Sequence, residues 1–327
     1  MMGVYHLMGL GLSAGAVVGP LSYLAHRYDR WNPADQRFYR RSGERSQRRA
    51  DLRVGDVQAL ILFTTKEVLN GDILAHSYVL NPPGRVTKGP EQKPGPMKPI
   101  LRELLMQVWP VLSGGRTSAS LFWCSINRRD LSDAYNRIVR VISALANVGK
   151  QGHEMWANLT GGNNVTNLAL ELAAAFSGEV ARVYYVQAQD QDAERCVRHT
   201  SEDGYWVEIP IMPLSLSRVT LAVLDLLSAA LADTSTIYGK LCNFHWGLIE
   251  GIETKEALYA EYLRPMWKQG LIVEDNDKYA VGPRWELVAP YWNALEEARS
   301  APVTIEQLSQ SESWITHETI ELKGGHL

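Results

Sequence analysis

Cysteine is scarce in this sequence, and the cysteines that are present do not pair. There are three, Cys124, Cys196 and Cys242, far apart and without a CxxC spacing. This pattern excludes a cysteine zinc site and is typical of a reducing compartment, so we expect a cytoplasmic protein. The sequence also lacks a P-loop, a GxSxG elbow and zinc-ligand spacing. We therefore expect no metal and no cofactor, and the motifs identify no catalytic residue.

A strong excess of charge of either sign is missing as well. The chain has 33 Lys and Arg against 36 Asp and Glu, a net charge of −3. The global balance attracts neither nucleic acid nor membrane, so any such binding requires a local patch. What the chain has is length and apolar content: 327 residues that are 46% hydrophobic. Such a chain can bury a sizeable core, and its length indicates two domains.

One uncharged stretch, Leu7 to Ala25, is about long enough to cross a membrane. Four glycines and Pro20 interrupt it, and no basic residue precedes it as a signal peptide requires. A buried strand, a glycine loop and a helix explain the same residues. We favour that interpretation, and a membrane span is the alternative.

Apolar strand-like runs alternate with helical periodicity over the first two thirds of the chain. We expect strands at Val4–Met8, Gln58–Thr64, Ser118–Ser125, Met155–Leu159, Val183–Gln187 and Tyr205–Ile211. The helices expected between them are Ala16–Tyr28, Ile100–Leu112, Leu131–Val148 and one from Val165 onward, with a surface loop over 81–98. This alternation predicts an α/β fold with a Rossmann-like, mostly parallel sheet.

The fourth expected strand ends at Thr160-Gly161-Gly162, and a helix follows Asn163 and Asn164. A strand, a glycine turn and a helix direct free backbone N–H groups and the positive end of a helix dipole toward one point. That arrangement suits an anion, most often phosphate. An ordinary strand-to-helix connection explains the same residues equally well.

The first expected strand also runs into a small-residue loop, which reads GxGxxxG from Gly9 to Gly15. A dinucleotide fingerprint needs GxGxxG and an acidic residue at the end of the next strand. Here the spacing is one residue too long, and the next strand ends in Thr64-Thr65-Lys66. A nicotinamide or flavin site is therefore a weak interpretation. Ligands of parallel sheets lie above the carboxyl ends of the strands, where this loop, Asn127-Arg128 and the Gly161 turn would meet.

The stretch 27–53 is rich in arginine and also contains Trp31, Phe38 and Tyr39. It could hold a polyanion by charge and stacking. A solvated insertion or a basic rim around a pocket is the interpretation that we favour.

The C-terminal third has a different pattern. An apolar helix is expected over Leu216–Ala232, then helices over Tyr238–Ile249, after Thr254 and over Tyr259–Gln269, and a hairpin over 270–281. This order predicts a winged helix. Its candidate nucleic-acid contacts are Arg264 and Lys268, but its hairpin tip is acidic. A docking or dimerisation role is therefore at least as well supported as DNA binding.

These features together resemble the CARF-domain proteins of CRISPR type III systems. The marker is the Asn-Leu-Thr-Gly-Gly turn that opens a helix, supported by the first loop with Ser13 and the trailing winged helix. The resemblance predicts a CARF-like sensing domain over 1–215, a linker helix over 216–236, a winged-helix domain over 237–300 and a C-terminal tail over 301–327.

The resemblance implies a homodimer that binds a cyclic oligoadenylate, tetra- or hexa-adenylate, and relays binding to the winged helix as a regulator or accessory protein of an antiviral response. It also implies the ligand-binding residues, which are Leu12, Ser13, Ala14, Asn127, Arg128, Thr160, Gly161, Gly162, Asn163 and Asn164.

The sequence departs from the family at two residues that bear on catalysis. Many relatives have threonine and lysine after the glycine pair, where this chain has Asn163 and Asn164. Without the lysine charge, cleavage of the ligand is in doubt, so enzyme activity stays open. The paired Arg and His of the family's ribonucleases is also missing. A ring nuclease that cleaves cyclic oligoadenylate is the first alternative, and a DNA-binding transcriptional regulator is the second.

Overall fold

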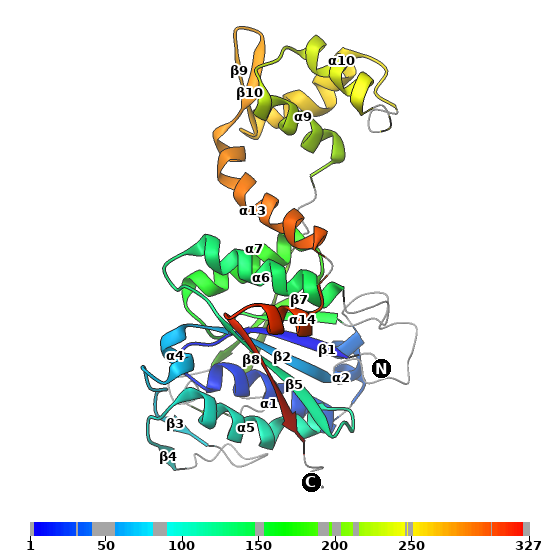
Figure 1. The fold of residues 1–327 in the computed structure, drawn as a ribbon. Coiled ribbons are helices and arrows are strands. Elements are labelled where there is room, and N and C mark those ends of the chain that lie inside the picture. The colour runs from blue at the N-terminus through cyan, green and yellow to red at the C-terminus, as the bar shows by residue number, and fades with distance from the viewer. Residues whose placement is uncertain are drawn as a thin grey trace. The chain divides into compact units, whose positions relative to one another are not determined.

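The structure of the chain is a computed structural model. It describes residues 3–30, 32–40, 56–80, 90–147, 154–188, 196–197, 204–211, 216–245, 247, 251–301 and 303–322. The chain divides into two compact units (Figure 1). The first contains Met1–Pro213 and Glu297–Leu327, and the second contains Leu214–Glu296.

A seven-stranded sheet forms the centre of the first unit, in the order β11-β5-β2-β1-β6-β7-β8. The bounds are β1 Val4–Gly9, β2 Val57–Thr64, β5 Ser118–Ser125, β6 Glu154–Asn158, β7 Val180–Ala188, β8 Gly204–Ile209 and β11 Ile315–Glu321. The five central strands are parallel, whereas β8 and β11 run antiparallel to their neighbours. The predicted α/β fold with a mostly parallel sheet is confirmed.

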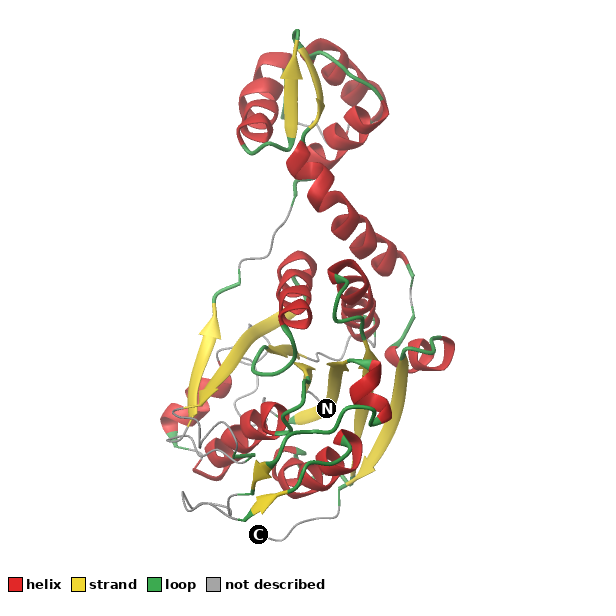
Figure 2. Ribbon diagram, turned by 90° about the vertical axis from the view of Figure 1, so that its left-hand side faces the viewer, coloured by secondary structure: helices red, strands yellow, loops and turns green. Residues whose placement is uncertain are grey.

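Helices cover both faces of this sheet (Figures 1 and 2). The helices α1 (Gly15–Arg30) and α5 (Met97–Leu112) pack on one face. The helices α6 (Leu131–Ala146) and α7 (Asn164–Ser177) pack on the other. Every residue of β1 is consequently buried, as expected for a central parallel strand.

The uncharged stretch Leu7 to Ala25 forms the end of β1, a short turn and the first part of α1, as the favoured interpretation predicted. None of the described helices is both long enough and apolar enough to cross a membrane.

Two elements of the first unit depart from the sequence-based expectations. Within the expected loop 81–98, Glu91–Gln92 forms β4, which pairs with β3 at Tyr78–Val79, while 81–89 lies outside the described residues. Residues 301–327 were expected to be a tail. Instead, α14 (Ile305–Ser311) leads into β11, which pairs with Ser118–Cys124 of β5. The strand went unpredicted because an edge position leaves only two of its seven residues buried.

The second unit is mostly helical, with one hairpin. Its elements are α9 Arg218–Ala229, α10 Thr234–Phe244, α11 Lys255–Leu258, η2 Tyr259–Leu263, α12 Arg264–Lys268, β9 Ile272–Asp275, β10 Lys278–Val281 and α13 Pro283–Ser300, whose last four residues belong to the first unit. The two helices expected from Thr254 onward are one continuous helical run. The expected hairpin is confirmed, with Asn276 and Asp277 at positive φ in its turn, as a type I′ turn requires. The winged helix itself stays a prediction.

Candidate functional site

The candidate site lies where the parallel strands end. The carboxyl ends of β5, β2, β1 and β6 follow one another along one edge of the sheet. Neighbouring strands are about 4.8 Å apart, so the ends of β5 and β6 are separated by about 14 Å. Backbone hydrogen bonds join the loops after β1 and β5 to the end of β2: Leu10 N–H donates to Phe63 O, and Ile126 N–H donates to Thr64 O.

The first loop and the predicted Gly161 turn are in direct backbone contact. A Cβ atom on Gly9 would lie 2.5 Å from the carbonyl oxygen of Gly161, and a Cβ atom on Gly161 would lie 2.6 Å from Ala16 Cβ. Only glycine permits so close an approach. The structure therefore brings together the two glycine segments that the sequence analysis placed at one site.

A buried asparagine that the sequence analysis did not single out holds the turn in place. Asn158 Oδ1 accepts a hydrogen bond from Thr160 N–H at 2.8 Å, and Asn158 Nδ2 donates to Ala16 O at 3.4 Å. The Ala16 carbonyl is available because Pro20, four residues on, has no N–H to donate. The signal in the sequence was Asn at the end of a strand, followed by a turn.

The side chains of the turn are mostly engaged within the protein. Asn163 caps α7 and accepts from Thr166 N–H at 2.9 Å. Thr160 Oγ1 accepts from Val186 N–H at 2.8 Å. Both had been expected to bind ligand. What the turn offers to a ligand is therefore its backbone and the exposed side chain of Asn164.

Five successive backbone amides, from Gly161 to Val165, donate no hydrogen bond to any described residue. They lie at the N-terminus of a 14-residue helix, where unpaired N–H groups and the helix dipole favour an anion. Gly162 in this turn has a φ of 89°. Glycine adopts such a positive φ without strain, because it has no Cβ atom.

The other predicted residues of the first loop have separate roles. Leu12 O accepts from His76 N–H, and Ala14 is buried with its carbonyl bonded to Val18 N–H. Ser13 is half-buried, and its hydroxyl forms no hydrogen bond with a described residue. Of this loop, Ser13 is the side chain that remains able to bind a ligand.

A pocket of about 610 Å³ opens at the carboxyl ends of β2 and β5, and we name it the β2–β5 pocket. It is lined by Lys66, Glu67, Ser125, Ile126, Asn127, Arg128, Arg129, Asp130, Asp133 and Arg137. It contains the predicted residues Asn127 and Arg128. Lys66, Glu67 and Arg129 were not predicted as site residues. Lys66 and Glu67 follow β2, and Arg129 follows β5.

An ion pair on α6 fixes the loop at the floor of this pocket. Arg137 binds Asp133 at 2.7 Å and donates to Ser125 O at 2.6 Å. Asp133 Oδ2 in turn accepts from Asn127 N–H at 3.1 Å. Since Asp130 caps α6, the loop is held at both ends while its side chains stay exposed.

Three cations of the pocket, Lys66, Arg128 and Arg129, are exposed and form no ion pair with any described residue. Glu67 faces the same space. Hydrogen bonds from its own backbone N–H and from the Thr65 hydroxyl hold the pKa of Glu67 below its usual value, and Arg128 and Arg129 lower it further. The pocket therefore presents free positive charge beside an ionised carboxylate.

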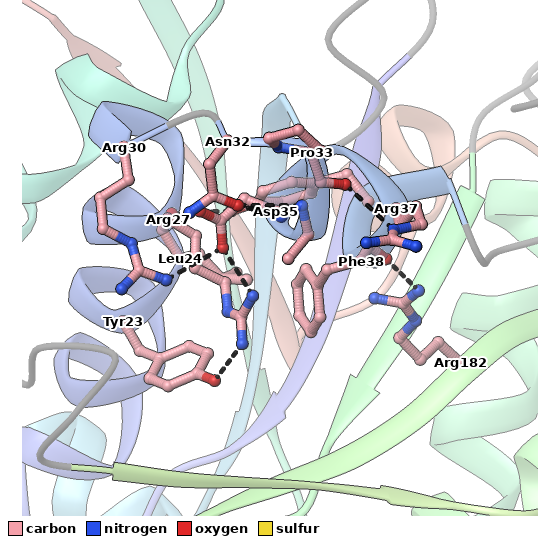
Figure 3. Close-up of polar contacts among 12 residues, drawn as sticks. Tyr23, Leu24, Arg27, Arg30, Asn32, Pro33, Asp35, Arg37, Phe38 and Arg182 are labelled. Carbon is pink, nitrogen blue, oxygen red and sulfur yellow. Dashed lines mark hydrogen bonds and ion pairs between the residues drawn. The ribbon is translucent and has the colours of Figure 1, made fainter.

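Two arginines of the described part of the arginine-rich stretch, Arg27 and Arg30, are paired within the fold (Figure 3), whereas Arg37 is exposed. Asp35 is fully buried and binds Arg27 at 2.7 Å and Arg30 at 3.1 Å. The Arg27 guanidinium also lies 4.3 Å from the ring centroid of Phe38. Residues 41–55 lie outside the described residues, so the role of that part of the stretch stays a prediction.

Arg182 of β7 is buried on the other side of Phe38. It donates to Phe38 O at 2.8 Å and lies 4.3 Å from the Trp156 ring centroid. Nearby, His6 Nδ1 is 2.9 Å from the Tyr184 hydroxyl. Burial, and then the charge of Arg182, lower the pKa of His6 to about 3, so His6 is neutral in the folded protein at physiological pH.

The two candidate nucleic-acid contacts lie on the second unit. Arg264 and Lys268 are both exposed on α12. The tip of the β9–β10 hairpin carries Glu274, Asp275 and Asp277, which would repel phosphate. Among the described residues, no group of three or more His, Cys, Asp or Glu side chains could hold a metal ion.

No protein-family model matches the chain. The chain is similar to an uncharacterized protein of Archaeoglobus fulgidus, with 21% identity over 318 residues. The similarity covers 90% of this chain and 92% of that protein, so it extends into both units without assigning a function to either.

Proposed function

We propose that the protein is a sensor that binds a cyclic oligoadenylate along the carboxyl edge of its sheet. The observation that carries the proposal is the run of five backbone amides from Gly161 to Val165, beside the Gly9 loop, that donate to no described residue. An anionic ligand supplies the acceptors that these amides lack. A ligand with several phosphates can reach both this turn and the cations about 14 Å away at the end of β5.

In this proposal the protein acts as a homodimer, with two such edges around one ligand, and the second unit is a winged helix that receives the signal. A two-fold ligand matches a two-fold axis, because each half of the ligand then meets the same residues. The hairpin and the preceding helices of the second unit support the winged-helix assignment. The cytoplasm, where type III systems act, is the location that this proposal requires.

The test is calorimetry with cyclic tetra-adenylate and cyclic hexa-adenylate. The decisive variant is Asn164→Asp, which places a negative charge at the first residue of α7. That charge favours the helix through its dipole but repels a bound phosphate. We expect wild type to bind one ring and Asn164→Asp to lose binding while keeping its thermal stability.

The matched control is Ser235→Asp, which adds the same charge near the N-terminus of α10 in the second unit. It should bind as wild type does. An absence of heat with either ring, using folded wild-type dimer, rejects the proposal, and so does unchanged binding by Asn164→Asp.

A ring nuclease is the second candidate, favoured by the hydroxyl of Ser13 on the first loop, which bonds to none of the residues that the structure describes. This hydroxyl could position the ligand for attack of a ribose hydroxyl on the neighbouring phosphate. Prolonged incubation with cyclic tetra-adenylate and chromatography of the products decides between sensing and cleavage. An intact ring excludes the nuclease, whereas linear products that Ser13→Ala fails to form support it.

A further inference from the structure

The β2–β5 pocket is chemically mixed in a way that a site for a simple anion would not be. Lys66, Arg128 and Arg129 supply positive charge and form no ion pair within the described part of the chain. Glu67 adds a carboxylate within the same 610 Å³. A carboxylate repels a bare phosphate, but it accepts hydrogen bonds strongly from a hydroxyl group. The best ligand for this combination carries a phosphate and a hydroxyl donor close together.

The position of Glu67 in the fold agrees with this chemistry. It follows β2, the strand next to β1, at the second residue of the short helix α4 (Lys66–Asn70). In dinucleotide-binding sheets with this central strand order, an acidic residue near the end of the second strand hydrogen-bonds the ribose 2′-hydroxyl. Glu67 shares that place after the second strand, although it lies 52 residues beyond Gly15 rather than about 20. Glu67 directly follows Lys66, the residue at which the expected second strand was taken to end without an acid.

Hydrogen bonds hold in place the loop that carries the arginines of the pocket. The Asp133–Arg137 pair and the Asp130 cap fix the loop that carries Arg128 and Arg129. Asp133 and Arg137 neutralise each other's charge. The other cations of the pocket, Lys66, Arg128 and Arg129, are therefore available to the ligand. A loop that is already held in this way loses less conformational entropy when a ligand binds.

We infer that the β2–β5 pocket binds a ribose phosphate, with Lys66, Arg128 and Arg129 on the phosphate and Glu67 accepting a hydrogen bond from the 2′-hydroxyl. The identity of the complete ligand rests on the proposed function, but the chemistry of the pocket does not. This inference makes Glu67 a specificity-determining residue that distinguishes ribonucleotides from deoxyribonucleotides.

The experiment measures affinity for two probes, cyclic tetra-adenylate and ATP, each in its ribose and 2′-deoxyribose form. Wild type should prefer the ribose form by on the order of tenfold, which corresponds to one hydrogen bond to a charged group. In Glu67→Gln this ratio should fall toward one. A purely structural role of Glu67 would lower both affinities together and leave the ratio unchanged.

The phosphate contacts are tested by salt dependence. Each lost contact between a cation and a phosphate should make the slope of log affinity against log salt shallower. We expect a shallower slope in Arg129→Ala and in Lys66→Ala. The control is Arg218→Ala, an exposed arginine of the second unit, which removes the same charge and should keep the wild-type slope.

The outcomes separate the two proposals. If cyclic tetra-adenylate binds but Arg129→Ala and Glu67→Gln behave like wild type, the inference is overturned and the proposed function stands. If ATP binds with the expected ribose preference and the ring does not, the pocket is established and the proposed function fails. Binding of no nucleotide to folded wild type overturns both.

Discussion

The buried histidine of β1 should make the first unit sensitive to mild acid. His6 is fully buried, and its pKa is lowered from 6.5 to about 3. Above pH 6.5 the imidazole is neutral in both the folded and the unfolded chain, so it adds no pH dependence. Between pH 6.5 and 3 the unfolded chain takes up a proton that the folded protein excludes. The free energy of unfolding therefore decreases as the pH is lowered from 6.5 to about 3.

The size of this effect follows from the two pKa values. Each pH unit inside the window costs about 1.4 kcal/mol. At pH 5, which is 1.5 units below the unfolded value, the loss is about 2 kcal/mol. The variant His6→Gln keeps a polar partner for Tyr184 but does not titrate. It should be less stable than wild type at pH 7.5, yet lose about 2 kcal/mol less between pH 7.5 and 5.

Urea unfolding should be measured by hydrogen–deuterium exchange of the peptide that contains β1, because this peptide reports on the first unit alone. The labelling pulse is brief and is applied at one fixed pH for all samples. His317→Gln, which removes an exposed histidine of β11, serves as the control and should retain the wild-type pH dependence. Equal losses in wild type and His6→Gln, within about 0.5 kcal/mol, would show that burial of His6 does not control acid sensitivity.

Two further predictions concern stability. Gly161→Ala should lower the free energy of unfolding by about 1–3 kcal/mol, because its new methyl group meets the Gly9 carbonyl. The control Gly239→Ala in α10 has open space and should raise the free energy of unfolding by about 0.5–1 kcal/mol. Equal shifts in the urea midpoint of the two variants would contradict the close backbone contact. Asp35→Asn should cost about 3–5 kcal/mol by leaving two arginines of α1 without their buried partner. The exposed Asp29→Asn should stay within about 0.5 kcal/mol of wild type, and a similarly small change in Asp35→Asn would show that the buried pair contributes little.

Local pattern was sufficient for most of the elements in the first unit. The strand β5 has the predicted bounds, and β2 differs from its prediction by one residue. Both are continuous apolar runs, which central parallel strands require because both of their faces are buried. The hairpin turn at Asn276-Asp277 was also predictable, because these residue types tolerate the positive φ of a type I′ turn.

The candidate site was predictable from the sequence only where the close approach of two backbone segments requires glycine. Gly9 and Gly161 marked the loops that meet, but Asn158, which anchors the turn, carries no such signature. Of the ten residues that line the β2–β5 pocket, the sequence predicted two, Asn127 and Arg128, both on the β5 side. Its other side comes from Lys66 and Glu67, about 60 residues away in the chain, and only the parallel pairing of β2 with β5 brings the two sides together.

The sequence by itself determined the alternation of strands and helices, because the period of buried residues is a local property of each segment. The tertiary structure alone decided that β11 completes the sheet and that Glu67 lies beside Arg128. Edge pairing and pocket composition depend on which strands become neighbours, and that choice is made by the burial of the whole core rather than by any single segment.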